Sequence, residues 1–388
     1  MRKGWEIKKM KEICKLINGR AYSKNELLKN GKYRVLRVGN FFTNQDWYFS
    51  DLELPNEKYC ENGDLLYAWS ASFGPRIWTE EKVIYHYHIW KVIPNENYVT
   101  KDFLFKLLEW DIDKIKKDHG TGTTMMHVGK GSMDERDVPL PPLHEQQRIV
   151  AILEKAFAAI DKAKANTEKN LQNAKELFES YLQNIFSHPG KDWEEKRLGE
   201  VCNYEKIPNN RNNLPYVGLE HIESNSGKFL GTKNPTSVKS LTFFFTKSNI
   251  LYGRLRPYLN KVLLPDFDGH CSTEIFPIKV HLKLDKRFLY YWLTNSSTVK
   301  MINATWTGAR MPRANMNAVL EFSFMLPTLK EQILIVNKLD SLKIETQKLE
   351  TLYRQKLEDL EELKKSILQK AFKGQLDYDS YDLSDLSD

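Results

Sequence analysis

Basic side chains beside short apolar runs are the residues of this sequence whose types and spacing suggest a chemistry, and that chemistry is nucleic-acid binding. Arg254 and Arg256 follow the apolar run 250–252, so on a strand they would share a face. From that face a guanidinium group can bind a phosphate or the O6/N7 edge of guanine. Tyr258 and Lys261 would extend the same surface. The alternative is a solvated edge with surface arginines.

Two loops with similar composition add further candidates. Residues 120–125 are rich in Gly and Thr, and residues 306–313 combine Thr, Gly and Arg. Glycine permits a close backbone approach, while Thr, Arg and Asn can donate to phosphates or base edges. A flexible surface loop is the alternative in both cases. With the segment around Trp69, the loops complete the predicted DNA-binding set, which adds Trp69, Ser70, Ser72, Arg76, Thr121, Thr123, Thr124, Lys130, Arg310, Arg313 and Asn315.

Catalytic motifs are missing from the sequence. Its one Asn-Pro pair, Asn234-Pro235, is followed by Thr rather than by the Pro-aromatic pair of an adenine methyltransferase. The segment 129–131 lacks the spacing of a phosphate-binding loop. His86 and His88 would lie on one strand face, but no third metal ligand accompanies them, which favours a structural or DNA-facing role. We therefore expect a non-catalytic chain that binds no cofactor and no metal itself.

Composition and charge narrow the class of protein. The 388 residues are 41% hydrophobic and 28% charged, which argues against a disordered polyelectrolyte. We find neither a stretch long enough to span a membrane nor a signal peptide, and the four cysteines have no metal-ligand spacing. These features predict a cytoplasmic protein with reduced thiols. The net charge of +7 divides into two basic segments (1–139 and 188–325), a neutral segment between them, a weakly positive segment (326–376) and an acidic tail. Basic segments are candidates for a phosphate backbone.

A tandem duplication organises the chain. The heptapeptide Leu-Pro-Pro-Leu-His-Glu-Gln at 140–146 recurs as Leu-Pro-Thr-Leu-Lys-Glu-Gln at 326–332. Other matches keep the same order at offsets of 185 to 188, from Trp5 and Trp193 onward. Each copy begins with short apolar runs bounded by Gly, Asn and Pro, which predict a mixed α/β domain. We predict domains at 1–139 and 188–325, spacer helices at 140–187 and 326–376, and an acidic tail at 377–388.

The second part of each copy has the apolar spacing of a long helix. In the second copy a heptad seam runs through Leu339, Leu342, Thr346, Leu349, Tyr353, Lys356, Leu360, Leu363 and Ile367, and the first copy has matching positions from Leu153 to Tyr181 that include Asn170 and Leu177. Thr328 and Glu331 fit a capping box, and Pro142 fits a helix start. Helices of this length exceed one small domain, so we expect them to pair antiparallel. The predicted fold is α+β, with two heads on a two-helix coiled coil and pseudo-two-fold symmetry.

This order of domains and motifs resembles the specificity subunit of type I restriction-modification enzymes over nearly the whole chain. The resemblance is carried by the segments 193–201, 250–261, 271–274 and 326–332. It implies that each head is a target recognition domain reading one half of a bipartite, asymmetric site in double-stranded DNA. It also implies a coiled coil that sets the spacer and docks two methyltransferase (modification) subunits. S-adenosylmethionine, ATP and Mg²⁺ would then belong to partner subunits, including the restriction/translocase subunits.

The first copy departs from the pattern at the expected contact surface. Where the second copy has Arg254-Leu-Arg256-Pro, the first has Trp69-Ser-Ala-Ser, and 271–274 is replaced by Tyr85-His-Tyr-His88. Divergent heads on matched helices are what two different half-sites require. The alternative is a coiled-coil scaffold that does not bind DNA directly, which the two basic heads argue against.

Overall fold

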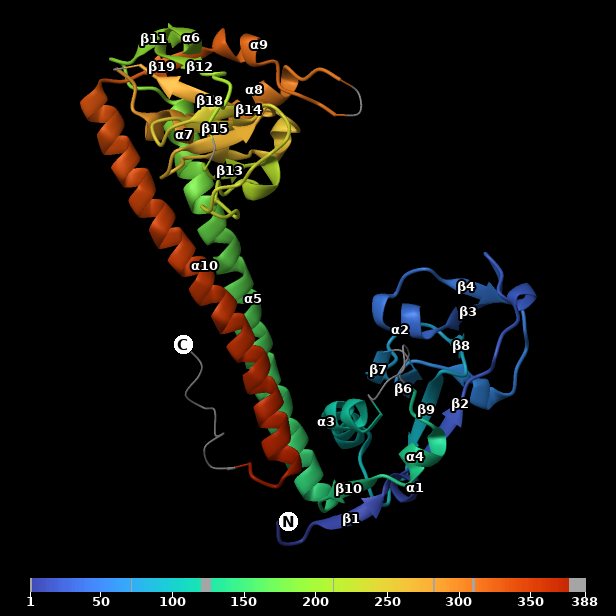
Figure 1. The fold of residues 1–388 in the computed structure, drawn as a ribbon. Helices are drawn as coiled ribbons and strands as arrows, with labels where there is room; N and C mark the ends of the chain where they lie inside the picture. The colour runs from blue at the N-terminus through green and yellow to red at the C-terminus, as the bar shows by residue number, and fades with distance from the viewer. Residues whose placement is uncertain are drawn as a thin grey trace. The chain divides into compact units, whose positions relative to one another are not determined.

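The computed structural model describes residues 2–70, 72–119, 127–211, 213–281, 283–308 and 311–376, and its chain divides into two compact units. Unit 1 comprises Met1–Asn166 together with Lys356–Asp388, and unit 2 comprises Thr167–Gln355 (Figure 1). Each of the two long helices contributes one part to each unit. Unit 1 is therefore built from two segments that are far apart in the sequence.

Unit 1 contains two four-stranded sheets and a two-stranded one. The first sheet has the order β2 (Cys14–Asn18), β9 (Ile89–Pro94), β6 (Leu65–Ser70) and β7 (Ser72–Ile77). The second has the order β4 (Tyr48–Ser50), β3 (Tyr33–Leu36), β8 (Val83–Tyr85) and β5 (Tyr59–Cys60). The pair β1 (Glu6–Lys9) and β10 (Asp137–Leu140) joins the two ends of the head, with Glu6 opposite Leu140. Short helices complete the unit: α1 (Met10–Ile13), α2 (Val38–Thr43) and α4 (Lys130–Asp134).

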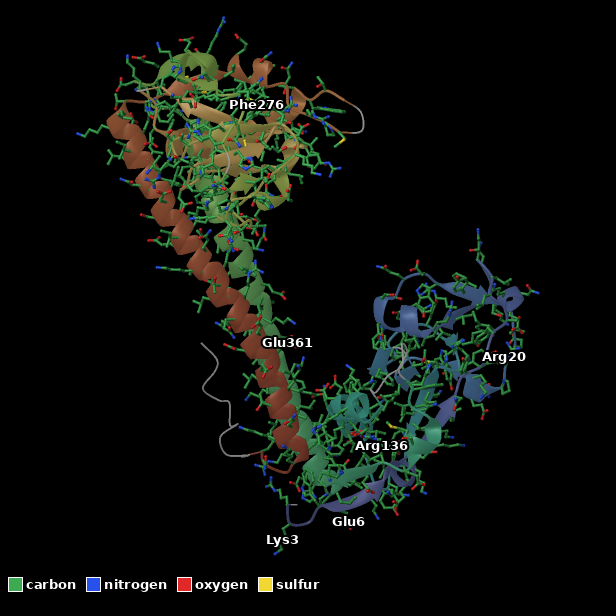
Figure 2. The ribbon with its side chains drawn as sticks, in the orientation of Figure 1. Lys3, Glu6, Arg20, Arg136, Phe276 and Glu361 are labelled. Atoms are coloured by element: carbon green, nitrogen blue, oxygen red, sulfur yellow. The ribbon has the colours of Figure 1, made fainter. Side chains whose placement is uncertain are left out.

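Helix α3 (Lys101–His119) packs on β7 and is fastened by a buried ion pair. Arg136, labelled in Figure 2, donates through Nε and a terminal nitrogen to Asp111 at 2.5 and 2.8 Å. Asp111 is 3% exposed, so the bidentate guanidinium replaces the water that an ionised carboxylate would otherwise need. The helix thereby keeps its apolar face on the core.

Unit 2 repeats this plan. One sheet has the order β12 (Cys202–Tyr204), β18 (Ile275–Val280), β15 (Ile250–Gly253) and β16 (Val262–Leu263), and the other β13 (Tyr216–Val217), β17 (Gly269–Ser272) and β14 (Thr242–Phe245). The strands β11 (Glu194–Arg197) and β19 (Ser323–Leu326) pair as β1 and β10 do in unit 1. Four short helices follow the chain order α6 (Leu198–Val201), α7 (Lys286–Thr294), α8 (Ser296–Ala304) and α9 (Met316–Leu320).

The two longest helices are α5 (Leu143–Ser187) and α10 (Leu329–Phe372), and they pair antiparallel within each unit. In unit 1, Lys164 forms an ion pair with Glu361 (labelled in Figure 2), while Asp161, one turn earlier, lies 3.3 Å from Lys364, one turn later. In unit 2, the Lys338 ammonium lies 5.1 Å from the centre of the Tyr181 ring. The residue numbers of the contacting partners therefore decrease along α10 as they increase along α5, which makes the two helices antiparallel. The predicted α+β fold with an antiparallel two-helix coiled coil is confirmed.

The repeated glutamine explains the heptapeptide motif. Gln146 is fully buried; its carbonyl oxygen accepts from the amide of Thr100 at 2.9 Å, and its Nε2 donates to the carbonyls of Tyr98 and Pro141 at 2.7 and 2.8 Å. Thr100 immediately precedes α3. Gln332 is equally buried and makes the matching bonds at 2.7, 2.9 and 2.8 Å to Asp285, Lys283 and Pro327. One side chain therefore fastens the start of each long helix to the start of a helix in its head.

The predicted seam holds through Thr346 on α10 and Thr167 on α5, but it is wrong at alternate positions farther along each helix. Leu177, Leu349 and Leu363 are 49%, 37% and 47% exposed, and Asn170 and Lys356 are exposed as well. On α10 the seam instead passes through the partly covered Glu350, Leu357 and Lys364. The reason is that long polar side chains cover apolar surface with their stems; the Lys364 ammonium lies 4.9 Å from the Phe157 ring centre.

The starts of the long helices are partly as predicted. Thr328 precedes α10, and its hydroxyl accepts from the Glu331 amide at 3.4 Å. The Glu331 carboxylate accepts from the indole N–H of Trp193 at 2.9 Å instead of closing a capping box. Pro142 directly precedes α5, as predicted. Within the described ranges, no helix has a stretch long and apolar enough to cross a bilayer.

Candidate nucleic-acid interface

In unit 2, two arginine side chains bind the same carboxylate. The Glu274 side chain accepts from Arg254 Nε at 3.0 Å and from Arg313 Nε at 2.9 Å, and a terminal nitrogen of Arg313 lies 2.8 Å from it. Partial burial opposes ionisation of Glu274, yet the two guanidinium groups lower the pKa of its carboxyl below the usual value. The three side chains are 22–36% exposed and carry one net positive charge. We call this group the Arg-Glu-Arg triad.

The backbone around the Arg-Glu-Arg triad is fixed by hydrogen bonds between three segments. The amide of Arg254, directly after β15, donates to the carbonyl of Glu274 at 3.0 Å, and the amide of Ala314 donates to the carbonyl of Arg254 at 2.9 Å. A β-bridge joins Leu255 to Arg313. The guanidinium carbon of Arg254 also lies 5.0 Å from the ring centre of Phe276, the labelled residue of β18 in Figure 2. Sites held on paired strands in this way are more rigid than sites on free loops.

The prediction that Arg254 and Arg256 share a strand face is wrong. Strand β15 ends at Gly253, and Arg256 has a left-handed backbone with φ 52°. Its amide donates to the carbonyl of Pro312 at 2.7 Å, which stabilises that conformation and turns the chain. Arg256 and Tyr258 are both exposed, Tyr258 by 52%.

Other predicted residues of unit 2 serve its own backbone. The Lys261 ammonium donates to the carbonyl of Leu219 at 2.7 Å. Asn315 precedes α9, and its side chain accepts from the amide of Ala318 at 3.3 Å. Asn315 thus caps a helix while remaining exposed. Arg310 lies outside the described residues.

Unit 1 gathers aromatic rings and imidazoles. The Trp69 indole N–H donates to the carbonyl of Tyr87 at 2.9 Å. The Trp69 ring centre lies 5.0 Å from that of His88 and 6.0 Å from that of His127, and both contacts are edge-to-face. Burial lowers the pKa of His88, and the neighbouring His127 and Arg37 side chains act in the same direction. We call Trp69, His88 and His127 the Trp-His-His triad.

The other residues of unit 1 that were predicted to bind DNA lie partly at the surface and partly in the interior. Ser70 is 2% exposed, whereas Ser72 and Lys130 are exposed. Arg76 donates to the carbonyl of Phe41, and its guanidinium carbon lies 5.3 Å from the Trp78 ring centre. Arg76 is therefore engaged in packing within the head. Thr121, Thr123 and Thr124 lie outside the described residues.

The two triads occupy the same place in the repeated backbone. Trp69 donates its amide to the carbonyl of His88 and accepts from the amide of Val128, as Arg254 does with Glu274 and Ala314. The bridge between Ser70 and His127 matches that between Leu255 and Arg313. The residue numbers differ by 185 for the first triad members and by 186 for the other two. Glu274, His88 and His127 were missing from the predicted DNA-binding set. The repeat offset applied to Arg313 would have indicated His127, but it leads from no predicted residue to Glu274 or His88.

A polar hollow of about 660 Å³ lies next to the Trp-His-His triad and shares His88 with it. Arg37, Asn40, Tyr48 and His86 also line it. His86 lies 4.8 Å from His88 between ring centres, and burial lowers its pKa to about 4. In the described part of the chain, no three His, Cys, Asp or Glu side chains are grouped so that they could hold a metal ion.

Comparison with known proteins gives a consistent result. The family model described as "Type I restriction modification DNA specificity domain" matches residues 2–172 and again 190–359. The chain is 28% identical to the EcoDI specificity subunit of the type I restriction enzyme of Escherichia coli, over 96% of this chain and 88% of that protein. It is 25% identical to the MjaVIII specificity subunit of Methanocaldococcus jannaschii, over 96% and 93%.

Two solved structures share the fold. One, from a study of complex assembly and conformational transition of a type I R-M system, has a TM-score of 0.76 at 20% identity and covers 97% of this chain and 99% of that chain. The other, the HsdS subunit from Thermoanaerobacter tengcongensis, has a TM-score of 0.64 at 20% identity over 97% and 98%.

Proposed function

The chain belongs to the type I restriction-modification DNA specificity family, and on that premise we propose that each unit reads its own half of a bipartite, asymmetric DNA site. Sequence-specific DNA recognition is the function of this family, and the family model matches both halves of the chain. The finer assignments, which concern the residues in contact with DNA, the partner subunits and the spacer, belong to the proposal.

One observation carries the asymmetry of the site. The same hydrogen-bonded backbone presents a cationic Arg-Glu-Arg triad in unit 2 and the Trp-His-His triad in unit 1. Donors that differ in charge and shape select different base edges, because each base pair displays its own pattern in the major groove. Two triads of different chemistry at equivalent backbone positions therefore favour two different half-sites.

The long helices are proposed to set the spacer between the half-sites and to dock two modification (methyltransferase) subunits. Apolar side chains on the outside of α10 support docking: Ile344, Leu334 and Leu352 are 53%, 61% and 60% exposed. A protein partner that covered these side chains would gain the free energy of removing them from water. In this proposal S-adenosylmethionine, ATP and Mg²⁺ act in the modification and restriction/translocase subunits, and the assembly works in the cytoplasm.

Methylome sequencing with and without the gene tests this function. We expect gene-dependent adenine methylation at a two-part, non-palindromic motif, with one methylated base in each half. A continuous palindrome would contradict the assignment of one half-site to each unit. If the complex with its modification subunits shows no salt-dependent duplex binding, the chain acts as a scaffold instead.

A further inference from the structure

Resting on the proposed function, we infer that Glu274 is a positioning residue that holds Arg254 and Arg313 for a guanine edge in the half-site of unit 2. An arginine side chain has about 2 kcal/mol of rotamer entropy, so a free one binds its target less tightly and less selectively. The Glu274 carboxylate removes much of this freedom before DNA arrives, because it binds both Nε atoms.

The two arginines keep donors for a ligand. Within the described residues, the hydrogen bond of Arg254 uses only its Nε, and its two terminal nitrogens have no partner. Arg313 uses Nε and one terminal nitrogen on Glu274, and its other terminal nitrogen is a long 3.3 Å from the carbonyl of Met311. Guanidinium groups only donate, so the matching ligand must present acceptors.

Guanine fits this requirement better than the other bases. Its major-groove edge has two acceptors, O6 and N7. Adenine pairs one acceptor with an N6 donor, cytosine presents an N4 donor, and thymine has the single acceptor O4 beside a methyl group. A phosphate also accepts, but the carboxylate lowers the charge of the pair from two to one, which weakens a purely electrostatic contact. The Glu274 carboxylate therefore orients the two arginines while reducing the net charge of the group, and this combination is useful for reading a base edge.

Unit 1 provides the contrast. Its Trp-His-His triad has no guanidinium group, and burial favours the uncharged form of His88. Of the two triads, that of unit 2 alone offers guanidinium donors, so removing Glu274 should affect the half-site of unit 2 and leave the other unchanged. An effect confined to one half-site distinguishes loss of positioning from general loss of DNA affinity.

The test uses the complex with its modification subunits and duplexes that carry the methylated motif. Each guanine of the motif is replaced in turn by 7-deazaguanine, which removes the N7 acceptor. For the natural protein we expect one position, in one half-site, to lose about 5- to 150-fold in affinity. In Glu274→Gln the natural duplex should bind more weakly, and the 7-deazaguanine penalty at that position should shrink.

Glu205→Gln is the matched control. Glu205 has a similar exposure, 21% against 22%, lies in the same unit and pairs with Lys279 at 3.0 Å, but it is outside the triad. It should leave the 7-deazaguanine penalty unchanged. Arg254→Lys keeps the charge and loses the planar fork, so it should lose the penalty while retaining the salt dependence of binding.

Two outcomes would overturn the inference. If no 7-deazaguanine position matters and Arg254→Ala weakens all duplexes equally while lowering the salt slope by about one, the triad binds phosphate. If Glu274→Gln leaves the penalty unchanged, the carboxylate does not position the arginines. Failure of the proposed function would look different, because the natural complex would then show no preference for the motif over unrelated duplexes.

Discussion

Replacing the buried glutamine of either heptapeptide motif should destabilise one unit and spare the other. Gln332→Leu removes three hydrogen bonds and leaves the amide of Asp285 and the carbonyls of Lys283 and Pro327 without that partner. A typical hydrogen bond contributes about 1 kcal/mol net, and an unsatisfied buried group costs about 1–3 kcal/mol. Leucine fills a similar volume, so little of this loss comes from a cavity. We expect unit 2 to lose about 3–5 kcal/mol.

Amide hydrogen exchange measured by mass spectrometry resolves the loss by unit. In Gln332→Leu, protection should fall in α7 and the sheet β12-β18-β15-β16, while the strands of unit 1 keep theirs. Gln146→Leu should produce the opposite pattern. Gln347→Leu is the control, because Gln347 lies exposed on the same helix as Gln332, and its replacement should change stability by no more than about 0.5 kcal/mol. A loss below about 1 kcal/mol, or an equal loss in both units, would refute the role given to the glutamines.

Three further predictions concern unit 1 and the coiled coil. Phe372→Ala should lower the free energy of unfolding of unit 1 by about 3–5 kcal/mol in chemical denaturation, because Phe372 is 2% exposed and packs on Phe103 and Trp110. The control Leu352→Ala should have little effect, because Leu352 is 60% exposed. Acidification should destabilise unit 1, because His86 has a pKa near 6.5 in the unfolded chain and about 4 in the folded one. The stability that is present above pH 6.5 should fall as the pH approaches 4, by at most about 3 kcal/mol. His86→Asn should flatten the denaturation profile between those pH values, and an unflattened profile would assign the acid sensitivity to other groups. Deleting one heptad from both long helices shortens each by about 10 Å, so the spacer of the methylated motif should lose roughly three base pairs, or methylation should cease. An unchanged spacer would show that the helices do not set its length.

The sequence predicts the fold well because the repeat offset and the helical periodicity are local, additive signals. The glutamine motif and the starts of both long helices could be located in this way. The phase of the seam at Leu349 and Leu363 could not, because the choice between neighbouring positions depends on which stems the partner helix covers. The turn at Arg256 was missed because a left-handed backbone at a non-glycine residue depends on a hydrogen bond to a distant segment.

The candidate site was harder to predict than the fold. Arg254 and Arg313 were selected one by one for their charge, but nothing nearby in sequence indicates that Glu274 joins them. That contact requires three segments of unit 2 to pair as extended chains. The repeat places Glu274 at the position of His88, but it does not show that the carboxylate contacts either arginine.

Unit 1 is closed by residues that follow the whole of unit 2 in the chain. A terminal nitrogen of Arg2 lies 3.4 Å from the carbonyl of Leu376, a residue only 5% exposed, and Phe372 packs on Trp110. During synthesis, the surface of α3 that Phe372 covers therefore stays exposed until the whole of unit 2 and these late residues have been made. A nascent chain that stops early would leave that surface available to chaperones and proteases. Completion of unit 1 thus depends on synthesis of the chain through residue 376.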